Sequence, residues 1–249
     1  MKGLKMKRLD ILLSETCGLS RAFCKEIIES GEVMVNGRLC KKPGIKLCAQ
    51  DVINYNLPKE TYVGRGGYKL AHALDAFCCD VTGLACLDVG ASTGGFTDCL
   101  LKRGASQVYA VDVGTGQLAS ALRKNPKVVA MEQTDIRKLS TILPGVLFPF
   151  AVVDVSFVSL TIVLPAVWEL LDKGSRAVCL VKPQFEAGRQ SLNKKGVVKT
   201  AQARESAVKA VYDWAKANNM FPHKPIMSLI QGGDGNTEYF IQLSKEGKL

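Results

Sequence analysis

The chain has 249 residues, of which 47% are hydrophobic and 22% charged, and this composition is that of a folded protein and excludes a disordered one. Its 33 Lys and Arg outnumber its 23 Asp and Glu, which gives a formal net charge of +10 and favours a polyanionic partner such as a nucleic acid. No apolar run of about 18 residues and no secretory leader occurs, so we expect a cytoplasmic protein with no membrane partner.

Nine cysteines are scattered through the chain, and no two of them have C-x-x-C spacing. With only two histidines, His72 and His223, no zinc-site spacing can be assembled, and we expect no metal. An odd and scattered set of thiols favours a reducing compartment, in which cysteine behaves as a small core residue.

The first 55 residues predict a small module of two helices followed by short strands. Apolar residues at helical spacing in residues 8–15 predict the first helix, and a second is expected between an N-cap at Ser20 and Gly31. The dipeptide Asn36-Gly37 within VMVNGR is typical of a tight hairpin turn.

A linker is expected at residues 56–59, which divides the chain into a small RNA-binding domain (1–60) and a larger domain (61–249). Basic residues are dense at the start, because residues 1–66 hold 12 Lys and Arg against 7 Asp and Glu. An RNA-binding surface needs cations on one face, and the candidates are Arg8, Arg21, Lys25, Lys41 and Arg65. The alternative is an ordinary solvated basic face.

From Leu84 onward, short apolar runs alternate with segments of helical spacing, ending in a long helix predicted over residues 200–218. Such alternation requires a parallel sheet covered by helices on both faces. The runs PIMSLIQ and TEYFIQLS are joined by a turn at residues 232–235, so the last strand is expected to run antiparallel. The predicted fold class is α/β: a doubly wound, Rossmann-like sheet typical of class I methyltransferases, preceded by a small α+β domain.

A glycine-rich segment, GASTGGF at residues 90–96, follows the first strand of this larger domain. Such a turn lets the backbone approach a ligand closely and opens a helix whose N-terminal N–H groups are free. The dinucleotide fingerprint needs glycine where Ser92 stands, and a phosphate loop needs lysine where Phe96 stands, so both nucleotide interpretations weaken.

Carboxylates follow three successive strands, at Asp88, Asp112 and Asp135, and can accept hydrogen bonds from ribose hydroxyls or amino groups. This set suits a cationic, phosphate-free nucleoside, and we expect S-adenosylmethionine as cofactor. The candidate cofactor residues are Asp88, Gly90, Ala91, Ser92, Thr93, Gly94, Gly95, Phe96, Asp112 and Asp135. The alternative for each aspartate is a helix or turn cap.

Two charged residues end otherwise apolar strands, Asp154 in VVDVSF and Lys182 in CLVKPQFE, where unpaired charge is unfavourable. With Lys69 in GRGGYKL and Glu238 at the start of the last strand, they form a candidate catalytic set. We expect Lys182 to activate a ribose hydroxyl, Asp154 and Glu238 to orient Lys182, and Lys69 to help position the substrate. The alternative is a group of surface ion pairs.

The motifs RGGYKL, LDVGASTGGFTDCLL, VVDVSF, LVKPQFE and TEYF resemble those of the TlyA or haemolysin-A-like ribosomal RNA methyltransferases, whose catalytic domain is similar to FtsJ-type 2′-O-methyltransferases. Residues 7–55 resemble the RNA-binding domain named from ribosomal protein S4. The resemblance covers nearly the whole chain. One departure is Ser92-Thr93, where FtsJ-type loops commonly have Ala-Pro.

This resemblance implies a Lys-Asp-Lys-Glu tetrad at Lys69, Asp154, Lys182 and Glu238. It implies cofactor contact by residues 90–96, Asp112 and Asp135. It also implies methylation of a cytidine 2′-hydroxyl in ribosomal RNA, with ribosomal subunits as partners.

Three rival functions stay open from sequence: a nonenzymatic RNA-binding or ribosome-assembly protein, a membrane-active haemolysin, and a small-molecule methyltransferase. The first would tolerate loss of the tetrad or the glycine loop, and neither is lost. The second would need a spanning or strongly amphipathic segment, and none is recognised. The basic N-terminal module argues against the third. A substrate-side loop is expected around four cations, Arg189, Lys194, Lys195 and Lys199.

Overall fold

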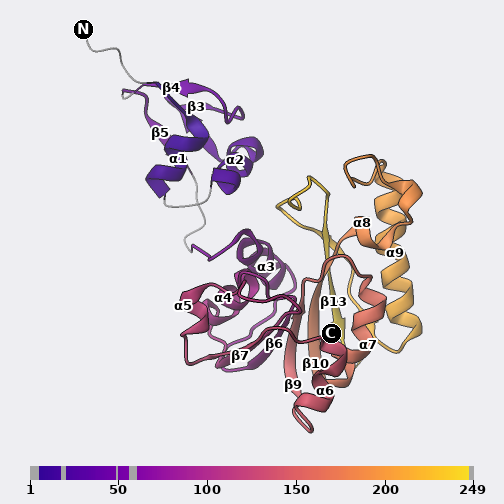
Figure 1. The fold of residues 1–249 in the computed structure, drawn as a ribbon. Coiled ribbons are helices and arrows are strands. Elements are labelled where there is room, and N and C mark those ends of the chain that lie inside the picture. The colour runs from indigo at the N-terminus through magenta and orange to yellow at the C-terminus, as the bar shows by residue number, and fades with distance from the viewer. Residues whose placement is uncertain (1–5, 18–20, 49, 56–60, 247–249) are drawn as a thin grey trace. The chain divides into compact units, whose positions relative to one another are not determined.

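A computed structural model describes residues 6–17, 21–48, 50–55 and 61–246. The chain divides into two compact units, Met1–Thr61 and Tyr62–Leu249, and Figure 1 shows the elements of each. Each unit has its own hydrophobic core.

In its described residues, the smaller unit has two helices and five short strands. Their bounds are β1 Lys7–Arg8, α1 Leu9–Cys17, α2 Arg21–Ser30, β2 Val33–Val35, β3 Arg38–Leu39, β4 Lys46–Leu47 and β5 Ile53–Tyr55. Strand β1 pairs with β4, and β2 pairs with both β3 and β5, all antiparallel. The core is formed by apolar residues of the helices and β2, including Leu9, Leu13, Ile28 and Val33, which are fully buried.

The hairpin predicted at Asn36-Gly37 is confirmed. Val35 lies opposite Arg38 in the β2–β3 pair, which leaves a two-residue turn. Both turn residues have positive φ, 51° for Asn36 and 75° for Gly37, as the tightest hairpin turns require. The expected N-cap at Ser20 and the expected linker at residues 56–59 lie outside the described residues.

The larger unit is built on one mostly parallel sheet, with the strand order β11-β13-β10-β9-β6-β7-β8 and β12 beside β13. Its strands are β6 Ala85–Val89, β7 Gln107–Val111, β8 Val128–Met131, β9 Phe148–Val153, β10 Leu171–Val181, β11 Phe221–Pro222, β12 Ile226–Met227 and β13 Tyr239–Ser244. Strands β6 to β10 run parallel, and β13 runs antiparallel to β10. The predicted doubly wound sheet with an antiparallel last strand is confirmed.

Helices cover both faces of this sheet (Figure 1). They are α3 Arg65–Ala76, α4 Gly95–Lys102, α5 Ser120–Arg123, α6 Leu139–Ile142, α7 Leu160–Glu169, α8 Pro183–Glu186 and α9 Ala201–Ala217, with 3₁₀ turns η1 Ile136–Lys138 and η2 Arg189–Ser191. Helices α3 and α4 pack against each other, and α9 packs against α7 and α8. Thr200 caps α9 by accepting a hydrogen bond from the Ala203 N–H at 3.1 Å, so the helix predicted over 200–218 is confirmed.

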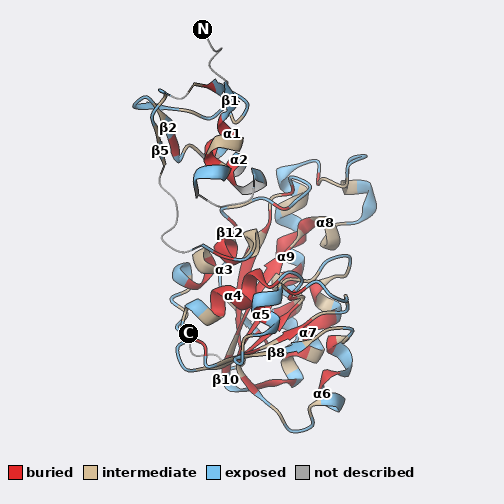
Figure 2. Cartoon of the chain, turned by 60° about the vertical axis from the view of Figure 1, so that its left-hand side comes forward, coloured by how far each residue is buried: buried red, intermediate tan, exposed pale blue. Residues whose placement is uncertain are grey.

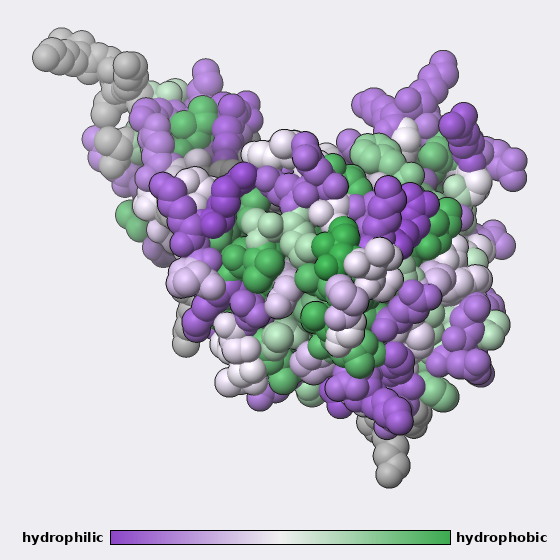
Figure 3. All heavy atoms as spheres, turned by 60° about the horizontal axis from the view of Figure 1, so that its bottom comes forward, coloured by the Kyte–Doolittle hydropathy of each residue, from purple (hydrophilic) through white to green (hydrophobic). Residues whose placement is uncertain are grey.

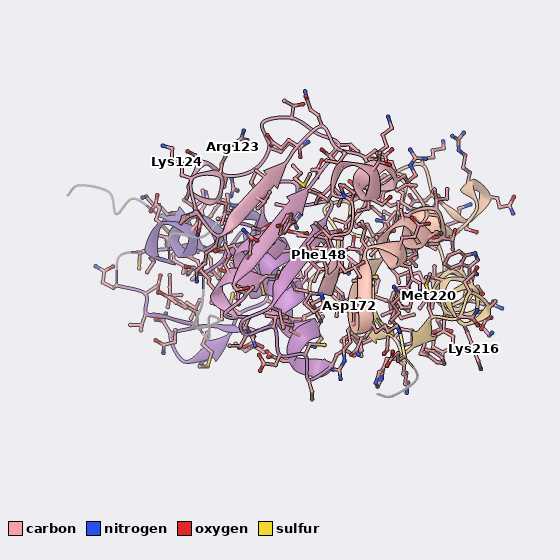
Figure 4. The ribbon with its side chains drawn as sticks, turned by 90° about the horizontal axis from the view of Figure 1, so that it is seen from below. Arg123, Lys124, Phe148, Asp172, Lys216 and Met220 are labelled. Atoms are coloured by element: carbon pink, nitrogen blue, oxygen red, sulfur yellow. The ribbon has the colours of Figure 1, made fainter. Side chains whose placement is uncertain are left out.

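The core of the larger unit lies between the sheet and its helices. Figure 2 shows the central strands of the sheet largely buried, since a parallel sheet covered on both faces has no solvated side. Figure 4 shows Phe148 in the middle of the strand layer and Arg123 and Lys124 at its periphery. Phe148 is 1% exposed and meets Tyr109 edge to face, with ring centroids 5.0 Å apart.

The face drawn in Figure 3 carries hydrophilic side chains interspersed among hydrophobic ones. Within the described residues, every helix is too short or too polar to cross a membrane.

Candidate active site

A pocket of about 520 Å³ opens where β6, β7 and β9 end. Three carboxylates line it, those of Asp112, Asp135 and Asp154, and so do two residues of the glycine loop, Gly90 and Ser92. In a doubly wound sheet, ligands bind outside the carboxyl ends of the strands. The pocket therefore lies where the sequence placed the cofactor.

The glycine loop has two positions at which only glycine fits. Gly90 has φ +85°, and a Cβ there would collide with the carbonyl oxygen of Asp154. Gly94 has φ +97°, and a Cβ there would strike the side chain of Leu122. Any other residue at these two positions would be strained and would have no space for its side chain. Glycine at position 90 therefore allows the loop backbone to lie directly against the end of β9.

Asp112 fastens this loop to the end of β7. Its Oδ2 accepts a hydrogen bond from the backbone N–H of Ser92 at 2.8 Å, and its Oδ1 accepts one from Gly114 at 2.7 Å. A carboxylate has about four acceptor positions. Asp112 can therefore hold the loop and still accept hydrogen bonds from a ligand in the pocket.

Asp135 has the capping role that the sequence left open as an alternative, and it lines the pocket as well. Its carboxylate accepts the backbone N–H of Arg137 at 2.9 Å and is paired with the Arg137 guanidinium. Hydrogen bonds from Arg137 lower the pKa of Asp135 to about 2.

Asp88 does not line the pocket; it is fully buried beneath the glycine loop. Thr97 of α4 donates a hydrogen bond to its Oδ2 at 2.6 Å, and its Oδ1 accepts none from the described residues. Burial raises the pKa of Asp88 to about 7. Its position supports the loop from below, which differs from the direct ligand contact expected from sequence.

The remaining loop residues do not line the pocket. Ala91 and Gly94 are buried, and Thr93 is exposed. Gly95 packs closely on the backbone of α3, and the Phe96 ring lies 6.2 Å from that of Phe240. Of the predicted run 90–96, the pocket is lined by Gly90 and Ser92.

The four predicted catalytic residues form two ion pairs. Nζ of Lys182 lies 2.7 Å from Oδ1 of Asp154, with both side chains largely buried. Nζ of Lys69 lies 2.6 Å from Oε2 of Glu238, and these side chains are 9% and 3% exposed. Removing one partner of a buried pair leaves an uncompensated charge, so each residue depends on the other.

Strand register explains why these residues meet. Val181 of β10 lies opposite Tyr239 of β13, and Cys179 of β10 lies beside Val153 of β9. Lys182, Glu238 and Asp154 each stand one residue beyond a paired position, so all three reach the same edge of the sheet. Lys69 comes from α3.

The expected partner of Glu238 was Lys182, and the structure corrects this. Glu238 binds Lys69, whereas Lys182 contacts Asp154 and Ser156. The reason is packing: a Cβ at Gly232 would collide with Oε1 of Glu238, so the preceding loop covers this carboxylate and turns it toward α3.

Several contributors were missed by sequence reasoning. Oγ of Ser156 accepts a hydrogen bond from Lys182, Gln117 binds Oγ of Ser92 at 3.1 Å, and Thr97 binds Asp88. Phe157 is 91% exposed beside the pocket. These residues lie in loops or in the first turn of a helix, where no hydrophobic periodicity marks a position. The sequence therefore does not distinguish them from ordinary polar or surface residues.

Two of the predicted RNA-binding cations share one carboxylate in the smaller unit. Arg8 and Arg21 both bind Asp10, with N–O distances of 3.0 and 2.9 Å, and Asp10 is buried. These hydrogen bonds, led by that from Arg8, lower the pKa of Asp10. Lys25 pairs with Glu29 on the same helix, and Lys41 is exposed. The Asp10 carboxylate thus holds the guanidinium groups of Arg8 and Arg21 close together.

The other predicted cations lie in the larger unit. Arg65 begins α3, and a Cβ on Gly233 would come within 3.3 Å of its guanidinium. The expected substrate-side loop follows α8, and its four cations, Arg189, Lys194, Lys195 and Lys199, are all exposed.

The sequence comparisons agree with this geometry. Residues 62–245 match the family model described as FtsJ-like methyltransferase, and residues 7–53 match that of the S4 domain. The chain belongs to the FtsJ-like methyltransferase family. The resemblance expected from the motifs is therefore confirmed.

Curated relatives extend over both units. The 16S/23S rRNA (cytidine-2′-O)-methyltransferase TlyA of Mycobacterium tuberculosis is 41% identical over 225 residues, which cover 90% of this chain and 84% of the relative. Hemolysin A of Brachyspira hyodysenteriae is 37% identical over 227 residues, covering 88% and 92%.

Solved structures share the fold. One from Streptococcus thermophilus is 38% identical, covers 98% of this chain and 90% of its own, and has a TM-score of 0.73. The O-methyltransferase of Bacillus cereus has a TM-score of 0.52 at 15% identity, with 76% and 85% of the chains covered. The latter likeness shows the fold alone.

Proposed function

We propose that this chain transfers a methyl group from S-adenosylmethionine to the 2′-hydroxyl of a cytidine ribose in ribosomal RNA. The observation that carries the proposal is the Lys182–Asp154 ion pair, because Asp154 lies in the wall of the pocket at the glycine loop. A lysine amine at this place can take the proton of a hydroxyl that is being methylated.

The pocket's side chains fit this cofactor. Three carboxylates line it, and its cationic lining residue, Arg137, is already paired with Asp135. Such a lining attracts a sulfonium and accepts hydrogen bonds from amino and hydroxyl groups, whereas it repels phosphate. Among the residues proposed to hold the cofactor, Gly90 offers close backbone approach, and Asp112 and Asp135 offer acceptors. When bound, S-adenosylmethionine supplies a methyl group on positively charged sulfur.

The chain's own part in the reaction is proton transfer. Lys182 acts as a base only as the neutral amine, so its Nζ must first lose a proton to solvent. Nζ would then accept the proton of the 2′-hydroxyl as the ribose oxygen is methylated, and a cofactor held by Gly90, Asp112 and Asp135 would supply that methyl group from its sulfur. The ammonium that forms on Lys182 is stabilised by Asp154 at 2.7 Å.

Lys69 and Glu238 are assigned to the substrate side of the site. Their mutual contact of 2.6 Å and their burial fix both side chains, and fixed charges cost no reorganisation during reaction. The ion pair links α3 to the residue before β13, and we assign to it the positioning of the ribose.

Ribosomal RNA is proposed as substrate on three grounds. The smaller unit carries an S4 domain with Arg8 and Arg21 gathered at Asp10. The net charge of +10 favours a polyanion. The M. tuberculosis relative is named for cytidine 2′-O-methylation of 16S and 23S rRNA.

The proposal is tested by incubating the protein with unmodified ribosomal subunits and labelled S-adenosylmethionine, then mapping the label. We expect label on a cytidine 2′-oxygen and at least a hundredfold loss of rate in Lys182→Ala. Lys173→Ala, an exposed lysine at the other end of β10, is the matched control and should retain full activity. Label on a base, or an undiminished rate in Lys182→Ala, would overturn the proposal.

A further inference from the structure

Lys182 has one aligned hydrogen bond in the described part of the chain. Its Nζ donates to Oγ of Ser156 at 2.8 Å. The approach to Oδ1 of Asp154 is an ion pair at 2.7 Å, but this oxygen is fully buried and accepts no hydrogen bond from the described residues. Asp154 therefore attracts the amine, while Ser156 determines the direction of one of its N–H bonds.

This difference matters because a neutral amine can accept a proton from one direction only, that of its lone pair. It carries two N–H bonds and one lone pair in tetrahedral arrangement, and only the lone pair can take a proton. Once Ser156 fixes one N–H, the lone pair has two positions left, and one of these is disfavoured because it would face the carboxylate of Asp154. Both Asp154 and Ser156 line the pocket, and one position of the lone pair is left that neither of them occupies.

We propose that Ser156 is a positioning residue that aims the lone pair of Lys182 at the hydroxyl to be methylated. The proposal rests on the function proposed above, in which Lys182 is the base. Proton transfer depends steeply on alignment, since a misplaced catalytic group loses rate without losing substrate affinity. Ser156 is thus expected to contribute to kcat and not to binding.

The position of Ser156 allows a clean substitution. It is exposed and lies in the turn between β9 and α7, and its hydroxyl makes its hydrogen bond to Lys182 alone within the described residues. The residue with the unusual backbone conformation in this turn is Phe157, with φ 64°, and not Ser156. Removing the hydroxyl should leave the fold and the pocket intact.

The experiment compares Ser156→Ala, Ser156→Thr and the wild type on ribosomal subunits from pH 6 to 10. We expect kcat of Ser156→Ala to fall about tenfold or more, with KM for RNA and Kd for S-adenosylmethionine unchanged. Ser156→Thr keeps the hydroxyl and should restore the rate.

The pH profile supplies a second readout. An acceptor of an ammonium N–H favours the charged form, so losing it should move the acid limb of the kcat profile to lower pH in Ser156→Ala. Other charges near Lys182 also affect this limb: Asp154 with Asp88 and Asp112 close to it, the Lys69–Glu238 pair and the Asp135–Arg137 pair. Within the described residues, none of these groups binds Ser156. Their effect on the pH profile should therefore be the same in the wild type and in Ser156→Ala.

The outcomes separate this inference from the function on which it rests. A Ser156→Ala protein with wild-type kcat and pH profile overturns the inference, while an inactive Lys182→Ala keeps the function. Equal losses in Ser156→Ala and Ser156→Thr without a shifted limb also overturn it, because they indicate a merely structural role. Full activity in Lys182→Ala overturns both.

Discussion

Asp88 and Asp135 are both aspartates at strand ends in the sequence, yet their surroundings oppose each other. Burial raises the pKa of Asp88 to about 7, whereas hydrogen bonds from Arg137 lower the pKa of Asp135 to about 2. Near pH 7, Asp135 is ionised, whereas about half of Asp88 carries a proton. A partly protonated Asp88 beneath the glycine loop adds less negative charge next to Asp154 and Asp112 than a fully ionised one would.

The buried carboxyl group makes stability depend on pH. Folded Asp88 keeps its proton up to about pH 7, whereas the unfolded side chain releases it near its ordinary pKa of 3.8. Between these values the folded state binds more protons, so the free energy of unfolding falls as pH rises from about 4 to about 7. We expect Asp88→Asn, which stays neutral, to lack this loss, which is on the order of 4 kcal/mol at most.

Urea unfolding of wild type and Asp88→Asn at pH 5 and pH 8 measures the effect. The wild type should lose more stability between these pH values than the variant. Parallel losses in the two proteins would show that Asp88 ionises normally in the fold.

At the scale of elements, one side chain joins two loops that lie far apart in sequence. Asn236 is 1% exposed and precedes β13 by three residues. Its Oδ1 accepts the N–H of Val198 at 3.0 Å, and its Nδ2 donates to the carbonyl of Gly196 at 3.1 Å. The loop that carries Lys194 and Lys195 is thereby fixed beside the loop that covers Glu238.

Substituting Asn236→Ala should loosen the Lys194–Lys195 loop, because two backbone groups lose their partner at about 1–3 kcal/mol each. We expect faster tryptic cleavage after Lys194 or Lys195 and reduced methylation of RNA, with unchanged affinity for S-adenosylmethionine. Asn218→Ala is the matched control, since Asn218 is exposed and binds the carbonyl of Trp214 at the end of α9. Equal cleavage rates in the two variants would refute the role of Asn236.

At the scale of the whole molecule, the two units have separate cores and separable tasks. The smaller contains the S4 domain, and the larger contains the pocket and both ion pairs. Deleting residues 1–61 should therefore leave binding of S-adenosylmethionine intact and reduce methylation of ribosomal subunits by at least tenfold, because phosphate contacts supply much of RNA affinity.

Calorimetry with the cofactor and label mapping on subunits measure the two activities of the truncated protein. The full chain should also lose RNA affinity steeply as salt rises, and the truncated chain should show a smaller salt slope. Undiminished methylation after truncation would place the RNA-binding surface wholly in the larger unit.

Local features of this protein could be predicted from its amino-acid sequence. Alternating apolar runs predicted the doubly wound sheet, Asn36-Gly37 predicted the hairpin, and the glycine spacing at residues 90–96 located the loop beside the pocket. These features depend on neighbours within a few residues, whose periodicity and turn chemistry are written directly in the chain. Asp154 and Lys182 were predicted because charge at the end of an apolar strand is unusual, whereas the full set of four, with Lys69 and Glu238, was implied by the family resemblance.

Contacts between side chains that are distant in sequence follow from the folded chain alone. Lys69 of α3 and Glu238, the residue before β13, are 169 residues apart in the sequence and form an ion pair in the fold. Asp88 contacts α4 through Thr97, whereas Asp112 lines the pocket. Such pairings depend on strand register and on which face of the sheet a side chain joins, and a shift of one residue would reverse them. Spacing along the chain carries no information on either, which is why the contact of Ser156 with Lys182 could be found only in the folded molecule.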